Sequence, residues 1–219
     1  LVGSEMCIRD RPNWERRSWA QRGVAMADQR SIDPDQLAGY RGQIDEYYRA
    51  VTRGHATALT NGDIDLGEYQ RRMAGSIVEV HAVQRKLGQG PLGMAGREAL
   101  QDTLTEQLGY FDDMVGQIER GQLSPAQILD RSGRYGANGG LSFNEGMAAA
   151  TAALAVTEQR FLGACSPHCP ECVDYAARGV QPVGVLPVPR SLCRCGLNCC
   201  CRLERYGLTG SVVGWMNCM

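Results

Sequence analysis

Residues 33–51 read DPDQLAGYRGQIDEYYRAV. The aspartate and proline at the start are typical of a helix N-terminus, because aspartate caps free N–H groups and proline fits the first turn. Apolar side chains then recur every three or four positions, as one face of an α-helix requires. The segment therefore predicts an amphipathic helix that continues to about Leu59 and ends before Asn61-Gly62-Asp63. The apolar face consists of Leu37, Tyr40, Ile44, Tyr47, Tyr48 and Val51.

Four further helices are predicted from the same period. Ser124-Pro125 repeats the cap-and-proline signal, and Ser142 with Glu145 has capping-box spacing. His81 is expected at the boundary between core and solvent. Because each helix is apolar on one face only, these faces must pack against one another, and the predicted fold class is mainly α, an antiparallel helical bundle. The four helices cover about residues 66–87, 93–120, 124–135 and 142–160.

The chain changes character from Gly163 onward. Prolines and glycines become frequent, the helical period disappears, and Val180–Pro187 could hold a short strand. A segment with so little to bury needs a staple such as a metal ion. Most of the cysteines are concentrated in this segment, which favours a metal site or a set of disulfides. They are Cys165, Cys169, Cys172, Cys193, Cys195, Cys199, Cys200 and Cys201.

The spacing of these cysteines favours zinc. Cys169-Pro-Glu-Cys172 is a C-x2-C clip, and Cys195-Gly-Leu-Asn-Cys199 is a second, C-x3-C clip. Two such clips can close a four-sulfur site around a structural Zn²⁺ with Zn–S bonds of roughly 2.3 Å. Cys201 competes with Cys199 for one position. The predicted metal ligands are therefore drawn from Cys169, Cys172, Cys195, Cys199 and Cys201.

Several alternatives remain open at the cysteine cluster. Cys193 competes with Cys195, His168 could replace one thiolate, and the cysteines could form disulfides or remain free. A nucleophilic pair of Cys165 and His168 is the weakest alternative, because catalytic pairs are normally assembled from distant segments. We therefore predict no catalytic residue and no enzyme. Arginines interleave with the cysteines, as in zinc knuckles that bind nucleic acid, which gives an alternative function; they are Arg194, Arg202 and Arg205.

Composition narrows the class of protein. A net charge of −1 and a pI of about 6.4 do not indicate that the whole chain binds nucleic acid. No apolar run approaches the ~20 residues of a membrane span. No signal peptide is evident, so a reducing compartment is expected, which favours thiolate–metal bonds over disulfides.

The N-terminus and the domain boundaries are predicted as follows. Residues 1–11 resemble a translated sequencing adaptor, and Met26 is a plausible true start. Residues 1–27 are accordingly expected to be artefactual or disordered. The helical bundle is expected over 28–160, a small Cys-rich zinc-binding module over 161–206, and a tail over 207–219.

The C-terminal motifs resemble those of a known group. His168-Cys169-Pro170-Glu171-Cys172, Gly179–Pro187 and Cys195–Cys201 are similar to the tail of tailed-phage minor capsid or head morphogenesis proteins, broadly of the Mu F-like kind, or of uncharacterised proteins encoded beside the portal gene. The likeness covers about residues 33–206. One departure is that Pro189 and Cys193-Arg194-Cys195 are present without the histidine that the Mu F-like core usually carries between them.

The resemblance implies a structural virion protein that acts in phage head morphogenesis. Its expected partners are portal and capsid proteins, and packaged DNA is a further expected contact. It implies no catalysis, no small-molecule substrate and no membrane partner. The expected location is the virion, and the host cytoplasm during assembly.

Overall fold

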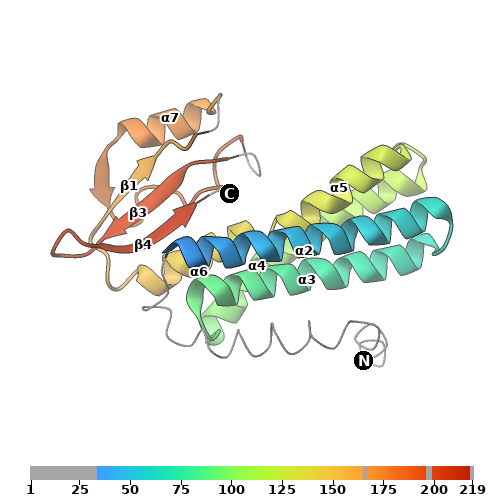
Figure 1. Cartoon of the computed structure of the whole chain (residues 1–219), viewed down its shortest axis with the longest axis horizontal. Helices are drawn as coiled ribbons and strands as arrows, with labels where there is room; N and C mark the ends of the chain where they lie inside the picture. The colour runs from blue at the N-terminus through green and yellow to red at the C-terminus, as the bar shows by residue number, and fades with distance from the viewer. Residues whose placement is uncertain (1–33, 165–166, 196–198, 218–219) are drawn as a thin grey trace.

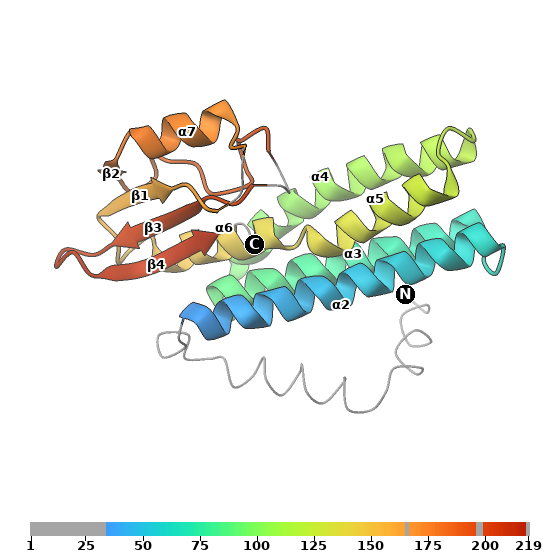
Figure 2. The ribbon, with the colours of Figure 1, turned by 45° about the horizontal axis from the view of Figure 1, so that its top comes forward.

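The computed structural model describes residues 34–164, 167–195 and 199–217. It is mainly helical, with a small sheet and a cysteine-rich cluster near the C-terminus, so the predicted fold class is confirmed. The long helices lie lengthwise against one another, and the sheet lies beside one end of them (Figures 1 and 2). The helices of the bundle are α2 (Pro34–Asn61), α3 (Leu66–Gln89), α4 (Met94–Glu119), α5 (Pro125–Ala137) and α6 (Gly140–Thr151).

Local capping signals start two of these helices. The Asp65 carboxylate accepts a hydrogen bond from the backbone N–H of Glu68 at 2.7 Å, which caps α3. Ser124 and Gln127 form a reciprocal capping box at the start of α5, with Pro125 in the first turn. The start predicted at Ser124-Pro125 is thus confirmed, whereas the predicted Asp33 cap lies outside the described residues.

The bundle is held together by two apolar cores that share α3. The first is built by α2 to α5, and Tyr69, Met73 and Ile77 of α3 are fully buried in it. The second joins α2, α3 and α6 around Val80 and Phe143. Helix α3 therefore lies between the other helices, and its buried apolar residues recur every three or four positions.

The last predicted helix, 142–160, is wrong in both its cap and its end. Helix α6 ends at Thr151, and strand β1 (Thr157–Phe161) follows. The proposed capping-box residues have other partners: Ser142 Oγ lies 2.8 Å from His81 Nδ1, and Glu145 forms a 2.7 Å ion pair with Arg85. His81 is fully buried instead of lying at the boundary.

The C-terminal sheet has four antiparallel strands in the order β2-β1-β3-β4. Strand β2 is Val180–Pro182, β3 is Arg202–Tyr206 and β4 is Val212–Asn217, and helix α7 (Pro170–Ala177) lies over β1. The sheet takes in residues on both sides of the boundaries expected at 160 and 206. In particular, the segment expected as a tail supplies β4.

The sheet packs on α6 through a small core and a buried ion pair. Phe143 of α6 contacts Trp215 of β4 with ring centroids 6.0 Å apart. Glu158 and Arg205, on adjacent strands, form a 3.1 Å ion pair with side chains 0% and 7% exposed. Arg205 also donates to the Ala148 carbonyl at 2.6 Å, which ties the sheet to α6. The apolar core beneath the sheet is centred on Leu186, Leu203 and Met216.

Candidate metal centre

Three segments bring the cysteines together. Cys169 is the N-cap residue of α7, Pro170 occupies the first turn, and Cys172 follows on the same turn. A helix N-terminus carries partial positive charge, which favours thiolate over thiol. The other sulfurs come from the loop that contains Cys193 and Cys195 and from the segment that enters β3, which contains Cys199 and Cys201.

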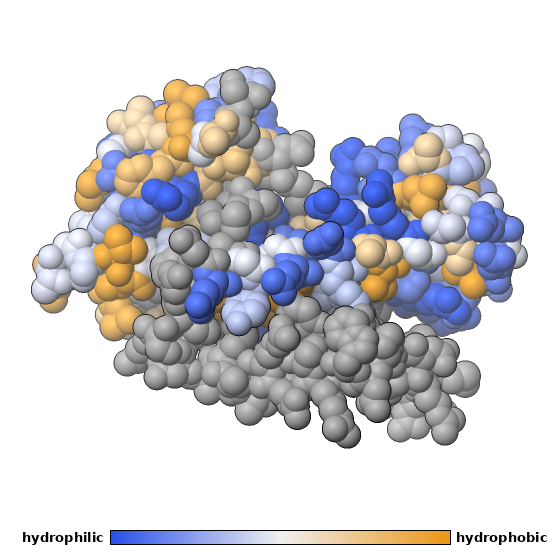
Figure 3. Space-filling view, viewed as in Figure 1, coloured by the Kyte–Doolittle hydropathy of each residue, from blue (hydrophilic) through white to orange (hydrophobic). Residues whose placement is uncertain are grey.

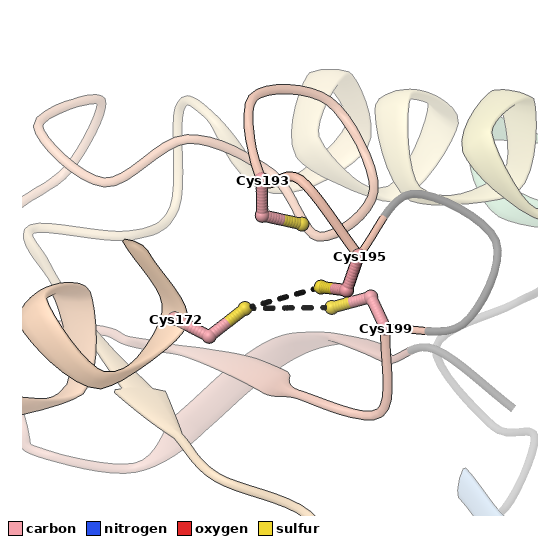
Figure 4. Close-up of side chains that lie close together, drawn as sticks. All are labelled: Cys172, Cys193, Cys195 and Cys199. Atoms are coloured by element: carbon pink, nitrogen blue, oxygen red, sulfur yellow. Dashed lines mark hydrogen bonds between the residues drawn. The ribbon is translucent and has the colours of Figure 1, made fainter. Parts of the chain in front are cut away.

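Four of these cysteines are positioned to bind a metal ion. The sulfurs of Cys172, Cys193, Cys195 and Cys199 all lie within 4.8 Å of one another. Figure 4 shows them converging, with Cys172 pointing toward Cys195 at 3.5 Å and toward Cys199 at 3.8 Å. A tetrahedron with metal–sulfur bonds of about 2.3 Å has sulfur–sulfur edges of about 3.8 Å. The described residues therefore fit a metal ion that is bound tetrahedrally by four thiolates.

Three of the five predicted ligands belong to this four-sulfur group, and the other two lie beside it. Cys172, Cys195 and Cys199 belong to it. Cys169 Sγ lies 3.5 Å from Cys195 Sγ at its edge, and Cys201 is fully buried in the same cluster. The sequence makes Cys193 a competitor of Cys195, but both sulfurs belong to the four-sulfur group. The C-x-C spacing of these two residues is the signal that could have identified Cys193.

The remaining candidates near the cluster have other roles. Cys200 is disulfide-bonded, so it offers no thiolate to the cluster. The ring Nε2 of His168 lies 3.1 Å from the Gly163 carbonyl oxygen, and His168 is not part of the four-sulfur group. Of the predicted Cys165–His168 pair, Cys165 lies outside the described residues.

Burial opposes ionisation of the central thiols. It raises the pKa values of Cys172, Cys195 and Cys201. At Cys169, burial raises the pKa, but hydrogen bonds from the backbone and side chains of Cys172 and Cys195 outweigh it, so this pKa is lowered. Because only thiolates bind metal tightly, ion binding must displace protons from the buried thiols.

The three arginines that interleave with the cysteines in the sequence differ in their exposure to solvent. Arg194 is largely exposed and lies 2.7 Å from Glu171, and Arg202 is half-exposed and lies 2.8 Å from Glu204. Arg205 is buried in its pair with Glu158, so its guanidinium is not on the surface. Of the predicted knuckle arginines, only the first two could reach a nucleic acid.

Comparison with protein-family models, with curated proteins and with solved structures finds no match. The resemblance to phage head proteins therefore remains a prediction from the motifs alone. Within the described residues, no helix combines the length and apolar character needed to cross a membrane.

Proposed function

We propose that the cysteine cluster binds structural Zn²⁺ and that the protein is a non-enzymatic assembly protein of a phage head. The observation that carries the metal proposal is the convergence of four sulfurs within 4.8 Å from three separate segments. Zinc suits this site because Zn²⁺ prefers tetrahedral coordination by thiolates. Four sulfur ligands leave no open position on the ion for a substrate. A closed site implies a structural role.

The module needs such a crosslink. The apolar core beneath its sheet contains few fully buried side chains, namely Leu186, Leu203 and Met216. Among the described residues, few backbone hydrogen bonds hold its two cysteine-bearing loops. Metal binding by a set of thiolates contributes its free energy directly to folding in such small modules. The ion would fix α7 against the segment that enters β3.

Exposed apolar side chains on the module support a binding role. Figure 3 shows hydrophobic residues gathered over the C-terminal module, whereas much of the visible bundle surface is hydrophilic. A concentration of exposed apolar side chains is typical of a protein-binding surface. Together with the phage-like motifs, this surface favours portal and capsid proteins as partners. The exposed large apolar side chains of the module include Val173, Val180, Val185, Leu192, Leu208 and Val212.

The metal proposal is tested by elemental analysis of the purified full chain, combined with thermal melting with and without a chelator. Bound zinc, and a lower melting temperature after chelation, would support the staple. Absence of metal with freely titratable thiols would overturn it.

The assembly proposal is tested by co-purification with co-expressed portal and major capsid proteins of a tailed phage. Val180→Asp and Val185→Asp should abolish co-purification while zinc content is unchanged. Met94→Asp is the control, because Met94 is 73% exposed at the start of α4, on the bundle. Salt-sensitive retention on DNA without binding to either protein would instead favour the nucleic-acid alternative.

A further inference from the structure

The cysteine pocket contains more thiols than one tetrahedral ion uses. Among the residues that the structure describes, six cysteines form no disulfide, and they belong to one cluster. One zinc ion needs four thiolates. Two thiols would then remain protonated beside a thiolate centre. They are drawn from Cys169, Cys172, Cys193, Cys195, Cys199 and Cys201.

The contacts among these sulfurs are uneven. In a tetrahedral site with one ion, each sulfur has three sulfur neighbours. Cys172 instead has the sulfurs of Cys193, Cys195 and Cys199 within 4.8 Å, and its thiol also interacts with those of Cys169 and Cys201. Cys195 contacts four, since Cys193 joins Cys169, Cys172 and Cys199 around it. Two metal ions that share two bridging sulfurs give each bridging sulfur more than three sulfur neighbours.

A buried arginine gives an independent indication that Cys201 is a thiolate. Arg160 is 2% exposed, and its Nε and Nη1 have no hydrogen-bond partner among the described residues. Its charge acts on Cys201, and its Nη2 donates to the Pro187 carbonyl. A buried cation with unsatisfied donors is costly. A metal-bound thiolate at Cys201 would place a negative charge near this guanidinium.

We propose that the pocket binds two zinc ions bridged by the thiolates of Cys172 and Cys195. Cys169 and Cys193 complete the first tetrahedron, and Cys199 and Cys201 complete the second. Each thiol releases its proton on binding, so six thiolates and two Zn²⁺ carry a net charge of −2, as four thiolates and one Zn²⁺ would. This inference rests on the metal binding proposed above and deepens it.

The two-ion arrangement requires a small movement. Terminal sulfurs on different ions of an edge-sharing pair lie about 6 Å apart when the metal–sulfur bonds are about 2.3 Å. Cys193 and Cys199 lie within 4.8 Å. Both are in loop segments outside the strands and helices, so they can separate without breaking the sheet.

The test counts ions in the full chain, purified under reducing conditions with zinc, by elemental analysis and native mass spectrometry. Two ions are expected in the unaltered chain. One ion is expected in Cys169→Ser and in Cys201→Ser, because each leaves four thiolates around the other ion. Cys200→Ser is the control and should retain two ions, because Cys200 is not one of the six cysteines proposed as ligands.

Substitution with ¹¹³Cd adds a direct readout of the bridge. Two coupled cadmium resonances are expected, because bridging sulfurs transmit coupling between the metals. One ion in the unaltered chain would overturn the bridged cluster but leave the single-ion staple intact, whereas no ion would overturn both. Two ions retained in both serine variants would also overturn it. Cys201 is buried, so Cys201→Ser could fail to fold. In that case the numbers of bound ions in Cys169→Ser, at a half-buried position, and in the unaltered chain still test the proposal.

Discussion

At the scale of single residues, His81 makes the stability of the bundle sensitive to acid. Burial lowers its pKa from 6.5 to about 4. The unfolded chain therefore takes up a proton first as the pH falls, so the folded state loses stability between pH 6.5 and pH 4. A difference of this size corresponds to about 3 kcal/mol.

The comparison of His81→Gln with the unaltered chain measures this effect. The variant keeps a polar group beside Ser142 but cannot titrate, so urea unfolding at pH 7 and pH 4.5 should show a smaller loss on acidification. His55→Gln is the control, because His55 lies at the half-buried contact with Ser76. Equal acid sensitivity of His81→Gln and the unaltered chain would contradict the prediction.

A second residue-scale prediction concerns the buried ion pair of Glu158 and Arg205. Glu158 also accepts hydrogen bonds from the backbone N–H groups of Gly184 and Leu186, at 2.9 and 2.8 Å. Glu158→Gln keeps an acceptor but leaves the Arg205 charge buried and unpaired, which costs about 3–5 kcal/mol. Chemical denaturation should reveal this loss. Asp174→Asn breaks the exposed pair with Arg178 and should cost less than about 1 kcal/mol; similar losses in both variants would refute the argument.

At the scale of elements, close helix packing depends on one glycine of α5. A Cβ at Gly136 would overlap the backbone carbonyl of Tyr48 on α2, whereas a Cβ at exposed Gly109 on α4 would meet nothing within 4 Å. Gly136→Ala should therefore destabilise the bundle by about 1–3 kcal/mol. Gly109→Ala should stabilise it by up to about 1 kcal/mol, because alanine favours helix. Thermal melting of both variants tests this, and an unchanged melting temperature for Gly136→Ala would show that α2 and α5 can separate.

The elements that could be predicted from the sequence are those whose signals are local. Ser124-Pro125 starts α5 and glycine-rich turns end α3 and α4, so these bounds follow from neighbouring residues. The strands could not be predicted in this way, because β1 pairs with β3 across more than 40 residues. The alanine-rich run before β1 favours helix locally, and pairing of Val156 with Tyr206 overrides that preference.

The sequence predicts the part of the candidate site that depends on neighbouring residues, and it does not predict the part that depends on long-range folding. The clip at Cys169 and Cys172 lies within one turn, so its spacing alone predicted that both sulfurs reach one cluster. Cys193 could not be ranked against Cys195, since the choice depends on how the loop folds over α7. Arg205 illustrates the opposite error: it is near the cysteines in sequence, but strand alternation turns it into the interior beside Glu158.

At the scale of the whole molecule, the two parts of the chain differ in what stabilises them. The bundle has two apolar cores of its own, whereas the cysteine cluster joins the loops of the module. Metal removal should therefore loosen the sheet while the long helices persist. Trp215 of β4 reports on this event, because its ring packs against Phe143 of α6.

The measurement uses the full chain with Trp14→Phe and Trp19→Phe, which leaves Trp215 as the sole tryptophan. Chelation should shift its emission to longer wavelength, because the indole leaves an apolar contact for water, while the far-ultraviolet circular dichroism of the helices changes little. Zinc should reverse the shift, and Cys172→Ser should show the shifted emission without chelator, because this residue is central to the sulfur cluster. Simultaneous loss of both signals would mean that the bundle folds only with the module. An unchanged emission would mean that the sheet holds its place on α6 through Leu203, Met216 and the Glu158–Arg205 pair without any metal.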